Sequence, residues 1–519
     1  MDNDIDYLDI INLFFNINNP EFNINKIDFN KNTLFFFQLL SFLLKKTKDE
    51  DYKNSFNVFN YFSAENLINN CYPKKYSDYI SLVSDSIYKY FNEISKIAPK
   101  DKKLIISVPD FTTSNIRNII ENSCKFFNLN LIQIYNNYIC LALSIIIENE
   151  KDTDKKPEDN EENDDDSESD NDEEDKNIIM IYFGKFYLDI SYFTLFYSNT
   201  QIRLECYYKR RIDYIGVVDI YLIIFAKFLE EHKLNLDVNE IKDIFILIND
   251  SFDNYVKNKI FKFTFKKDNK DYNFSLEEND FNIKILDPYL NYLKPKINDL
   301  IELILIENEL DIDKINWILN VGEMFEISHV KTIFEGDFIK GKMSNFFEKT
   351  LKDKTYKEHI KNALEYLEVE KHDNASIEIS DVCAQNISFK LIGNKCSTII
   401  DKNNNYDKTV SKEMYLLDLK KDYFNLILYE GNYLRIDRNY FINNYKIIGF
   451  SIENKNDNDD IVIKVNFNLN KNGVLNIEAF EMGNNNKNEN DNKKLIINNE
   501  INVDLENDKK LSIKSTNKK

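Results

Sequence analysis

The chain has 519 residues, 43% of them hydrophobic, with 39 Phe and 31 Tyr, so it can fill the cores of about two to four domains and is not a disordered protein. Its formal net charge is −21, of which the 15 acidic residues and four lysines of Lys151–Lys176 contribute −11. An acidic chain without a long basic stripe is repelled by phosphate backbones, which excludes broad, direct binding of nucleic acid.

The N-terminal part of the sequence predicts a cytoplasmic protein outside the membrane. Met1–Asp6 is acidic where a secretory signal begins with positive charge. The strongest apolar run, Leu34–Leu44, is interrupted by Gln38 and Ser41 and is shorter than the ~18 residues that span a bilayer. Six scattered cysteines without a Cys-x-x-Cys pair, and only four histidines, predict neither a disulfide framework nor a metal site.

Periodicity between residues 79 and 135 predicts a sheet covered by helices. Apolar residues recur at helical spacing through Tyr79–Ala98, and Leu104–Val108 then reads as a buried strand. Ser114 can cap a helix that runs to Phe127, and Leu131–Tyr135 reads as a second strand. This strand, helix and strand form a β-α-β unit.

The middle of the chain begins with a hairpin and continues with helices. Asn177–Phe193, NIIMIYFGKFYLDISYF, reads as two apolar strands folded back around Gly184. Further elements are predicted by their apolar spacing: helices at Val217–Leu229, at Ile297–Ile306 just past Pro295 and at Ser328–Phe334, and a buried strand at Ile315–Val321.

After Asp373 the pattern changes to short alternating segments, which predicts an all-β domain. The predicted strands are Phe424–Tyr429, Tyr445–Phe450, Ile461–Leu469, Val474–Phe480 and Lys494–Ile497. Asn472-Gly473, between two of them, is a hairpin pair that tolerates positive φ at both positions.

Several stretches match segments of one family in order and wording. They are LIISVPDFTTSNIRNIIENSCKFFNLNLIQIYNNYICLAL from Leu104, IYFGKFYLDIS from Ile181, ILNVGEMFEISHVKTIF from Ile318, LYEGNYLRIDRNYFINNYKIIGF from Leu428 and VNFNLNKNGVLNI from Val465. Between about Tyr76 and Asn498 they make the chain resemble the seventy-kilodalton heat-shock chaperone family. The pairing of YEG with NGVLNI is the most specific part of this resemblance.

The resemblance implies a fold class of α/β plus all-β. Its implied parts are an actin-like, two-lobed (ribonuclease H-like) ATPase-type domain at 1–372, a linker at 373–381, a β-sandwich substrate-binding-type domain at 382–500 and a tail at 501–519. The polarity of the segment 149–177 predicts a disordered acidic insertion in the first domain. Because Lys519 is the last residue, we expect no helical lid.

The resemblance also implies that the nucleotide clamp has degenerated. Holding a triphosphate needs backbone N–H groups close to its oxygens, which glycines permit. The family's three hairpin glycines fall on Gly184, Lys185 and Phe186. Its acid near the metal falls on Tyr182, and its glutamate for the catalytic water falls on Asn137. We therefore expect no catalytic residues and no metal site at these positions.

The adenosine side is altered in the same way. The family's Gly-Gly-Ser-x-Arg falls on Gly322–Glu326, which places Glu323 at the second glycine and Glu326 where an arginine would stack on adenine. Losing one preorganised donor typically costs ~100-fold in rate, and by this resemblance every site of phosphate or metal contact is altered. We therefore predict that the protein is not an ATPase and needs no cofactor. Two alternatives are a phosphate-binding Lys185 and ATP kept as a structural ligand.

Two further departures concern coupling between the domains and peptide binding. The family's apolar linker docks on the first domain, whereas Ser376–Val382 alternates polar with apolar residues, so we expect this docking to be lost. Candidates for a peptide or partner cradle in the β-domain are Ile427, Leu428, Tyr429 and Ile448. Their simpler interpretation is plain core.

Such a chain is similar to the atypical, ribosome-associated Ssz-type members of the family. That implies a non-catalytic co-chaperone, a scaffold for a J-domain protein of the zuotin kind. Through this partner it would reach the ribosome and assist an active heat-shock-70 chaperone with nascent chains. Two alternatives are a divergent ATP-dependent folding chaperone and a nucleotide-exchange factor of the large heat-shock type.

Overall fold

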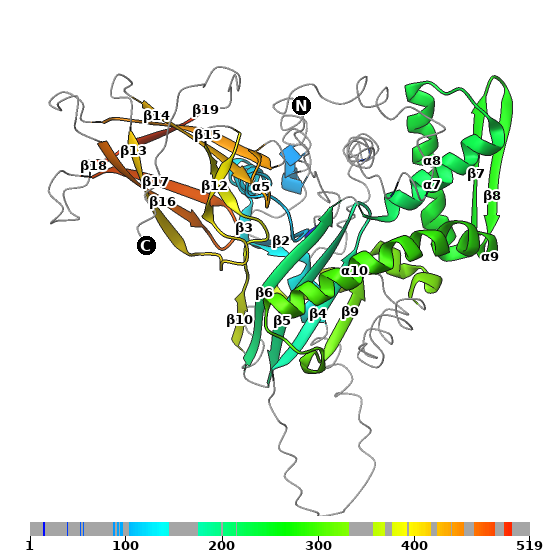
Figure 1. Cartoon of the computed structure of the whole chain (residues 1–519), viewed down its shortest axis with the longest axis horizontal. Helices are drawn as coiled ribbons and strands as arrows, with labels where there is room; N and C mark the ends of the chain where they lie inside the picture. The colour runs from blue at the N-terminus through cyan, green and yellow to red at the C-terminus, as the bar shows by residue number, and fades with distance from the viewer. Residues whose placement is uncertain are drawn as a thin grey trace, which may run out of the picture.

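The computed structural model describes residues 103–144, 175–198, 201–213, 215–331, 356–368, 376–391, 394–416, 423–436, 439–450, 461–482 and 493–500, together with 14–15 and single positions between 39 and 96. These residues form a mixed α/β structure with several sheets (Figure 1). Most of the predicted insertion 149–177, nearly all of residues 1–75 and the tail 501–519 lie outside them. β4 begins at Lys176, so the last two residues of the predicted insertion belong to a strand.

The central sheet has five strands in the order β10-β6-β5-β4-β9. They are β4 (Lys176–Phe183), β5 (Tyr187–Tyr197), β6 (Gln201–Asp213), β9 (Trp317–Val321) and β10 (Ser376–Ser380). β4 and β5 pair antiparallel on the two sides of Gly184, which confirms the predicted hairpin. β9 runs parallel to β4, so the turns that follow these two strands lie at the same edge of the sheet.

A second sheet contains the predicted β-α-β unit, which is confirmed. Its elements are β1 (Phe14–Phe15), β2 (Lys103–Val108), α5 (Ser114–Phe126) and β3 (Asn130–Asn136), with β2 and β3 parallel. The prediction that Ser114 caps α5 is wrong, because Ser114 is the first helical residue and Thr113 occupies the cap position. Of the helix predicted at 79–98, the residues that the structure describes between 87 and 96 are helical.

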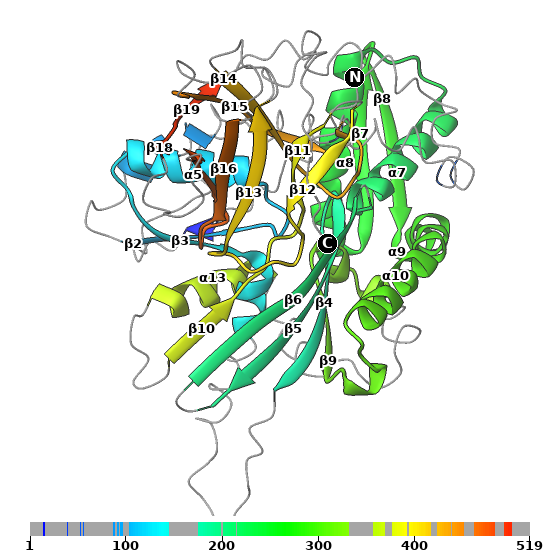
Figure 2. The ribbon, with the colours of Figure 1, turned by 60° about the vertical axis from the view of Figure 1, so that its left-hand side comes forward.

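The remaining helices of the first part surround the central sheet and extend beyond it (Figure 2). Among them are α7 (Val217–His232), α8 (Val238–Asn258), α9 (Glu278–Phe281), η4 (Asn282–Leu286), α10 (Asp287–Glu307), η5 (Ile312–Lys314), η6 (Glu323–Glu326) and α13 (Tyr356–Glu368). The hairpin of β7 (Ile260–Lys267) and β8 (Lys270–Glu277) packs on α8.

α10 begins ten residues earlier than predicted. Pro295 lies inside the helix, whereas the prediction placed it before the helix start. Tyr289, Leu290 and Leu293, all N-terminal to the proline, are buried in the main core. Their burial outweighs the hydrogen bond that a proline removes.

The segment predicted to be all-β forms two antiparallel sheets around their own core. One sheet, in the order β12-β11-β14-β15-β19, contains β11 (Ile387–Lys390), β12 (Cys396–Ile400), β14 (Tyr423–Glu430), β15 (Tyr440–Ile448) and β19 (Ile496–Glu500). The other, β13-β16-β17-β18, contains β13 (Thr409–Leu416), β16 (Ile461–Leu469), β17 (Leu475–Glu481) and β18 (Lys493–Lys494). Every second residue of β16 is buried between them, as its alternation predicts.

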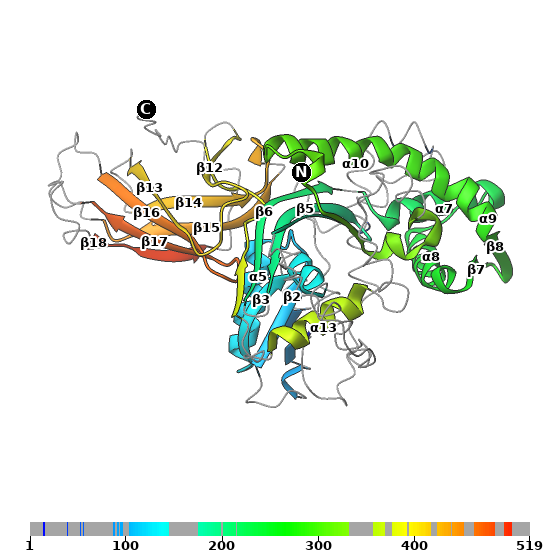
Figure 3. The same cartoon turned by 90° about the horizontal axis from the view of Figure 1, so that it is seen from below.

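The β-rich part lies beside β2, β3 and α5, on the side of the central sheet away from α7 and α8 (Figures 1 and 3). The β16–β17 turn lies at this boundary. Gly473 has a φ of +71°, but Asn472 does not have positive φ, so the predicted turn with two such residues is wrong. The Asn472 side chain is instead held by contacts with the first part of the chain.

Candidate functional site: the β4–β5 turn and the domain boundary

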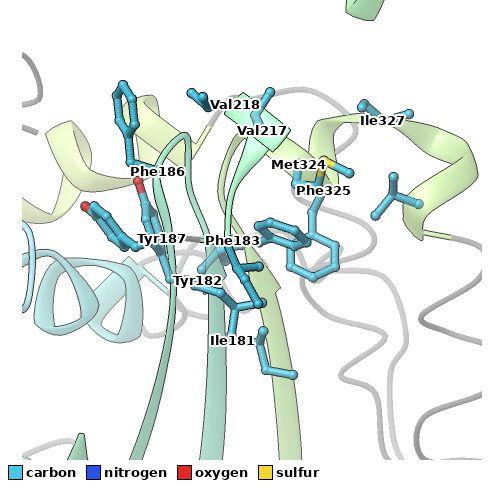
Figure 4. Packing of buried hydrophobic residues seen from close by; sticks show 14 of the residues in the cluster. Ile181, Tyr182, Phe183, Phe186, Tyr187, Val217, Val218, Met324, Phe325 and Ile327 are labelled. Carbon is cyan, nitrogen blue, oxygen red and sulfur yellow. The ribbon is translucent and has the colours of Figure 1, made fainter. Parts of the chain in front are cut away.

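Aromatic side chains fill the space around the β4–β5 turn (Figure 4). Tyr182 and Tyr187 stack with ring centroids 5.8 Å apart, and both are buried together with Phe186. Phe183 points to the other side, where its ring meets Phe325 at 6.0 Å. Tyr182, the predicted position of a lost acid near the metal, and Phe186, a predicted clamp position, are thus both buried aromatic residues at the end of the hairpin.

Gly184 is needed here for space and not for a left-handed backbone. Its φ is not in the positive range, but a Cβ at this position would lie 2.6 Å from Cε1 of Tyr182. The Tyr182 ring thus covers the position where a side chain would begin. Gly184 therefore leaves room for a neighbouring ring.

We predict that Gly184→Ala destabilises the protein by about 1–3 kcal/mol, because the added methyl group displaces the Tyr182 ring from a packed site. Urea unfolding measures the loss. The double variant Gly184→Ala/Tyr182→Ala serves as the control, since removing the ring makes room for the methyl group. If Gly184→Ala costs as much without the ring as with it, the proposed contact is not the cause.

The N-terminus of α7 makes its backbone hydrogen bonds with the β4–β5 turn. The N–H of Val217 donates to the carbonyl oxygen of Gly184 at 3.2 Å, and the N–H of Val218 donates to that of Lys185 at 3.0 Å. A helix N-terminus is a ready anion site when its N–H groups are available. Here two of these donors are already bonded to carbonyl groups of the turn.

The Lys185 side chain connects the turn to α8. Its Nζ donates to Oδ1 of Asn249 at 2.7 Å. Gly216, just before α7, lies so close to the Lys185 carbonyl that a Cβ there would be 2.2 Å from the oxygen. The turn, α7 and α8 are thus held together by the chain's own groups.

The β9–η6 turn brings the predicted adenosine-side residues next to the hairpin. Gly322 has a φ of +110°, and a Cβ there would lie 2.4 Å from the Phe183 carbonyl oxygen, so only glycine fits. Met324 and Phe325 follow and are buried, whereas Glu326 is exposed. Glu323 is partly buried.

Asn137 follows β3 at the start of a short helix and is only 3% exposed. Neither polar atom of its side chain has a hydrogen-bond partner within the part of the chain that the structure describes. An unpaired buried amide costs free energy.

A buried ion pair beside the turn was not expected from the sequence. Arg211 on β6 binds the carboxylate of Asp189 on β5 through two hydrogen bonds of 2.7 and 2.9 Å, and both side chains are at most 6% exposed. The guanidinium also lies over the rings of Tyr187 at 3.6 Å and Phe111 at 4.5 Å. Asp189 and Arg211 are direct partners in the β5–β6 register, so only the register could have revealed this pair.

The expectation that the linker no longer docks is wrong. Ser376–Ser380 forms β10, which pairs parallel with β6 in the central sheet. Its alternation suits an end strand, because Ile377 and Ile379 pack on the main core. An alternating pattern is therefore sufficient for this segment to pair with the central sheet.

Asp381, directly after β10, is the centre of a polar network. Its carboxylate accepts hydrogen bonds from Lys209 Nζ, from Asn136 Nδ2 at 2.5 Å and from the Tyr138 hydroxyl at 2.8 Å. The Lys209 side chain is completely buried. Burial alone would lower the pKa of Lys209, but Asp381 and other nearby groups raise it above its usual value, so the lysine stays charged.

The predicted cradle residues are divided between the faces of the sheet. Ile427 and Tyr429 form a small outer cluster with Ile436, whereas Leu428 points into the core between the sheets. Ile448 pairs with the exposed Ile496 at the β15–β19 edge. The four candidates therefore do not line one common surface.

The buried carboxyl of Glu430, at the end of β14, is expected to make the free energy of unfolding depend on pH. Burial raises the pKa of its carboxyl from 4.5 to about 7, although the Ser114 N–H and Arg117 lower it in part. Between pH 4.5 and about 7, the Glu430 carboxyl therefore keeps its proton in the folded protein but has lost it in the unfolded chain. The free energy of unfolding should therefore fall as pH rises through this window and level off above it.

Urea unfolding between pH 4.5 and 8.5 tests this dependence, with Glu430→Gln as the matched variant. The wild type should lose more stability than the variant as pH rises toward 7. Identical pH profiles for the two proteins would contradict this role of Glu430.

Within the described residues, no helix is long and apolar enough to cross a membrane, and no cluster of three or more potential metal ligands is found. A search of curated proteins finds no match. A family model described as "Hsp70 protein" matches residues 256–518, about half of the chain. The matched range includes the Gly322 turn, the docked strand β10 and all strands of the β-rich part. On this match the chain belongs to the Hsp70 family.

Proposed function

We propose that this Hsp70-family, chaperone-like protein is a non-catalytic scaffold whose nucleotide clamp has been filled by its own side chains. In this proposal residues 1–372 form an actin-like, two-lobed domain and residues 382–500 form a β-sandwich of the substrate-binding type. The segment between them contains the strand β10, which pairs with the central sheet. The filled turn, and not the overall fold, distinguishes this chain from an ATP-hydrolysing member.

The bonding of the α7 N-terminus carries this proposal. Binding a triphosphate requires free N–H donors, and the donors of Val217 and Val218 are bonded to the turn carbonyls. The aromatic rings of Tyr182, Phe186 and Tyr187 occupy the adjoining space. Phosphoryl transfer depends almost entirely on positioning and charge stabilisation, so a site without either leaves no catalytic route.

A scaffold of this kind suits a role in which other chaperones supply the ATPase. We infer that the partner is a J-domain protein of the zuotin kind, in a ribosome-associated complex that assists an active heat-shock-70 chaperone. Among the described residues, β12, β13 and β19 are end strands of their sheets. An end strand can pair with an extended segment of a partner through its free backbone groups.

Affinity purification of the full chain from cells tests this role, with an ordinary ATP-hydrolysing Hsp70 purified in parallel as the control. We expect a J-domain protein and ribosomes to accompany this chain equally with and without ATP, whereas the control should release its partners in response to ATP. If neither a J-domain protein nor ribosomes are recovered, the proposed role is wrong.

A turnover assay separates the scaffold from a divergent ATP-dependent chaperone. We expect no magnesium-dependent ATP hydrolysis above background by the purified chain. Turnover that is abolished by substitutions at Lys185 and Phe186 would show that the pocket was rebuilt, and it would favour the alternative.

A further inference from the structure

α5 begins at the boundary between the two parts of the molecule and lacks a capping group of its own. Thr113 has the extended backbone of a cap residue, with φ −64° and ψ 153°, but within the described structure its side chain makes no capping hydrogen bond. The first turn of α5 contains no acidic residue either. The N–H groups at a helix start need acceptors, and a negative charge there is favourable.

The β-rich part supplies the missing acceptor. Oε2 of Glu430, at the end of β14, accepts a hydrogen bond from the Ser114 N–H at 2.8 Å. The Ser114 hydroxyl accepts a second hydrogen bond, from the N–H of Leu475, the first residue of β17, at 2.9 Å. Two strands from different sheets are thus bonded to the first residue of α5. Each contact joins residues more than 300 positions apart in the sequence.

Arg117, three residues after Ser114 on α5, continues this contact. Its side chain is buried, and its Nη1 donates to the carbonyl oxygen of Asn472 at 3.1 Å, while its Nη2 donates to Asn136. Gly473 packs closely against Arg117, since a Cβ there would lie 3.0 Å from Cδ of the arginine, and the arginine side chain would have to shift slightly.

Asn472 completes the contact with the amide of its side chain. Its Oδ1 accepts from the N–H of Ile134 on β3 at 3.0 Å, and its Nδ2 donates to Glu121 on α5 at 2.9 Å. The β16–β17 turn is therefore bonded to both the helix and the second strand of the β-α-β unit.

We propose that Glu430, from the β-rich part, is the N-terminal cap of α5. Together with the hydrogen bonds of Ser114, Arg117 and Asn472, this cap forms a latch that holds the two domains together without nucleotide. Folding of the helix start and docking of the β-rich part are then one coupled event. The latch consists entirely of groups of this chain, so no ligand is needed to close it. A partner meets a single rigid body whose surface does not change with ATP. The inference does not depend on the identity of that partner.

Hydrogen exchange read by mass spectrometry on the full chain tests the latch. In Glu430→Ala we expect exchange to rise about fivefold to tenfold, the usual effect of losing a helix cap, in the first turn of α5 and in the β16–β17 turn together. Glu430→Gln, which keeps an acceptor oxygen, should show a smaller rise. Glu478→Ala, which truncates an exposed glutamate of β17, is the matched control and should leave α5 unchanged.

A second variant separates capping from docking. Thr113→Asp gives α5 a cap of its own, so Thr113→Asp/Glu430→Ala should regain slow exchange at the helix start but not in the β16–β17 turn. The proposal is overturned if Glu430→Ala leaves both segments unchanged, or if wild-type protein protects them only after ATP is added. These measurements need neither a partner nor ATP hydrolysis. A negative result would therefore contradict the latch without contradicting the proposed function.

Discussion

Replacing Asp381 by alanine is expected to destabilise the protein by about 3–5 kcal/mol, the usual cost of leaving a buried charge without its partner. Lys209 would be that charge, because its side chain is completely buried and Asp381 is its ion-pair partner. Asn136 and Tyr138 would lose the same acceptor. Since Asp381 follows β10 directly, we also expect the strand to detach from β6, so that unfolding in urea occurs in two transitions.

A double variant tests whether the unpaired lysine is the cause. Lys209→Met removes the charge, so Asp381→Ala/Lys209→Met should be more stable than Asp381→Ala alone. If Asp381→Ala lowers the free energy of unfolding by less than about 1 kcal/mol, which is the range of an exposed ion pair, the Asp381 network does not hold β10 on the central sheet.

Replacing Arg211 by alanine is expected to have a comparable effect, of about 3–5 kcal/mol, for the same physical reason. The variant leaves the carboxylate of Asp189 buried without its two charge-assisted hydrogen bonds. It also removes the cation that lies over the rings of Tyr187 and Phe111. Guanidinium or urea unfolding at pH 7 measures the loss.

The control for this prediction exchanges the pair for apolar groups. Arg211→Met/Asp189→Leu should recover most of the stability, because a buried pair replaced by well-packed apolar side chains is often neutral. A near-neutral Arg211→Ala would show that water reaches Asp189 and that the turn is less filled than the contacts indicate.

The sequence predicted elements whose signal is local. Apolar alternation placed β16, a single glycine placed the β4–β5 hairpin, and the order of apolar runs placed the β-α-β unit. Proline misled the prediction for α10, because the burial of side chains before Pro295 outweighs its local effect. The prediction that Ser114 caps α5 was also wrong, since its hydroxyl accepts a hydrogen bond from Leu475 in the β-rich part.

The composition of the candidate site was predictable, but the contacts that hold it together were not. The bulky residues at positions 182 and 186 could be read from the sequence, and the structure places them around the turn. The Asp189–Arg211 pair depends on strand register, and the Asp381 network depends on docking of β10. The low hydrophobicity of the linker did not predict docking, because an end strand needs only one apolar face.

The central claim is that the chain's own groups occupy the nucleotide clamp. Calorimetric titration of magnesium-ATP into the full protein tests it most directly, with an ATP-hydrolysing Hsp70 as the positive control. The account predicts no saturable binding, which means a Kd weaker than roughly 1 mM. Saturable binding with a Kd tighter than roughly 10 μM, at one site per chain, would contradict it.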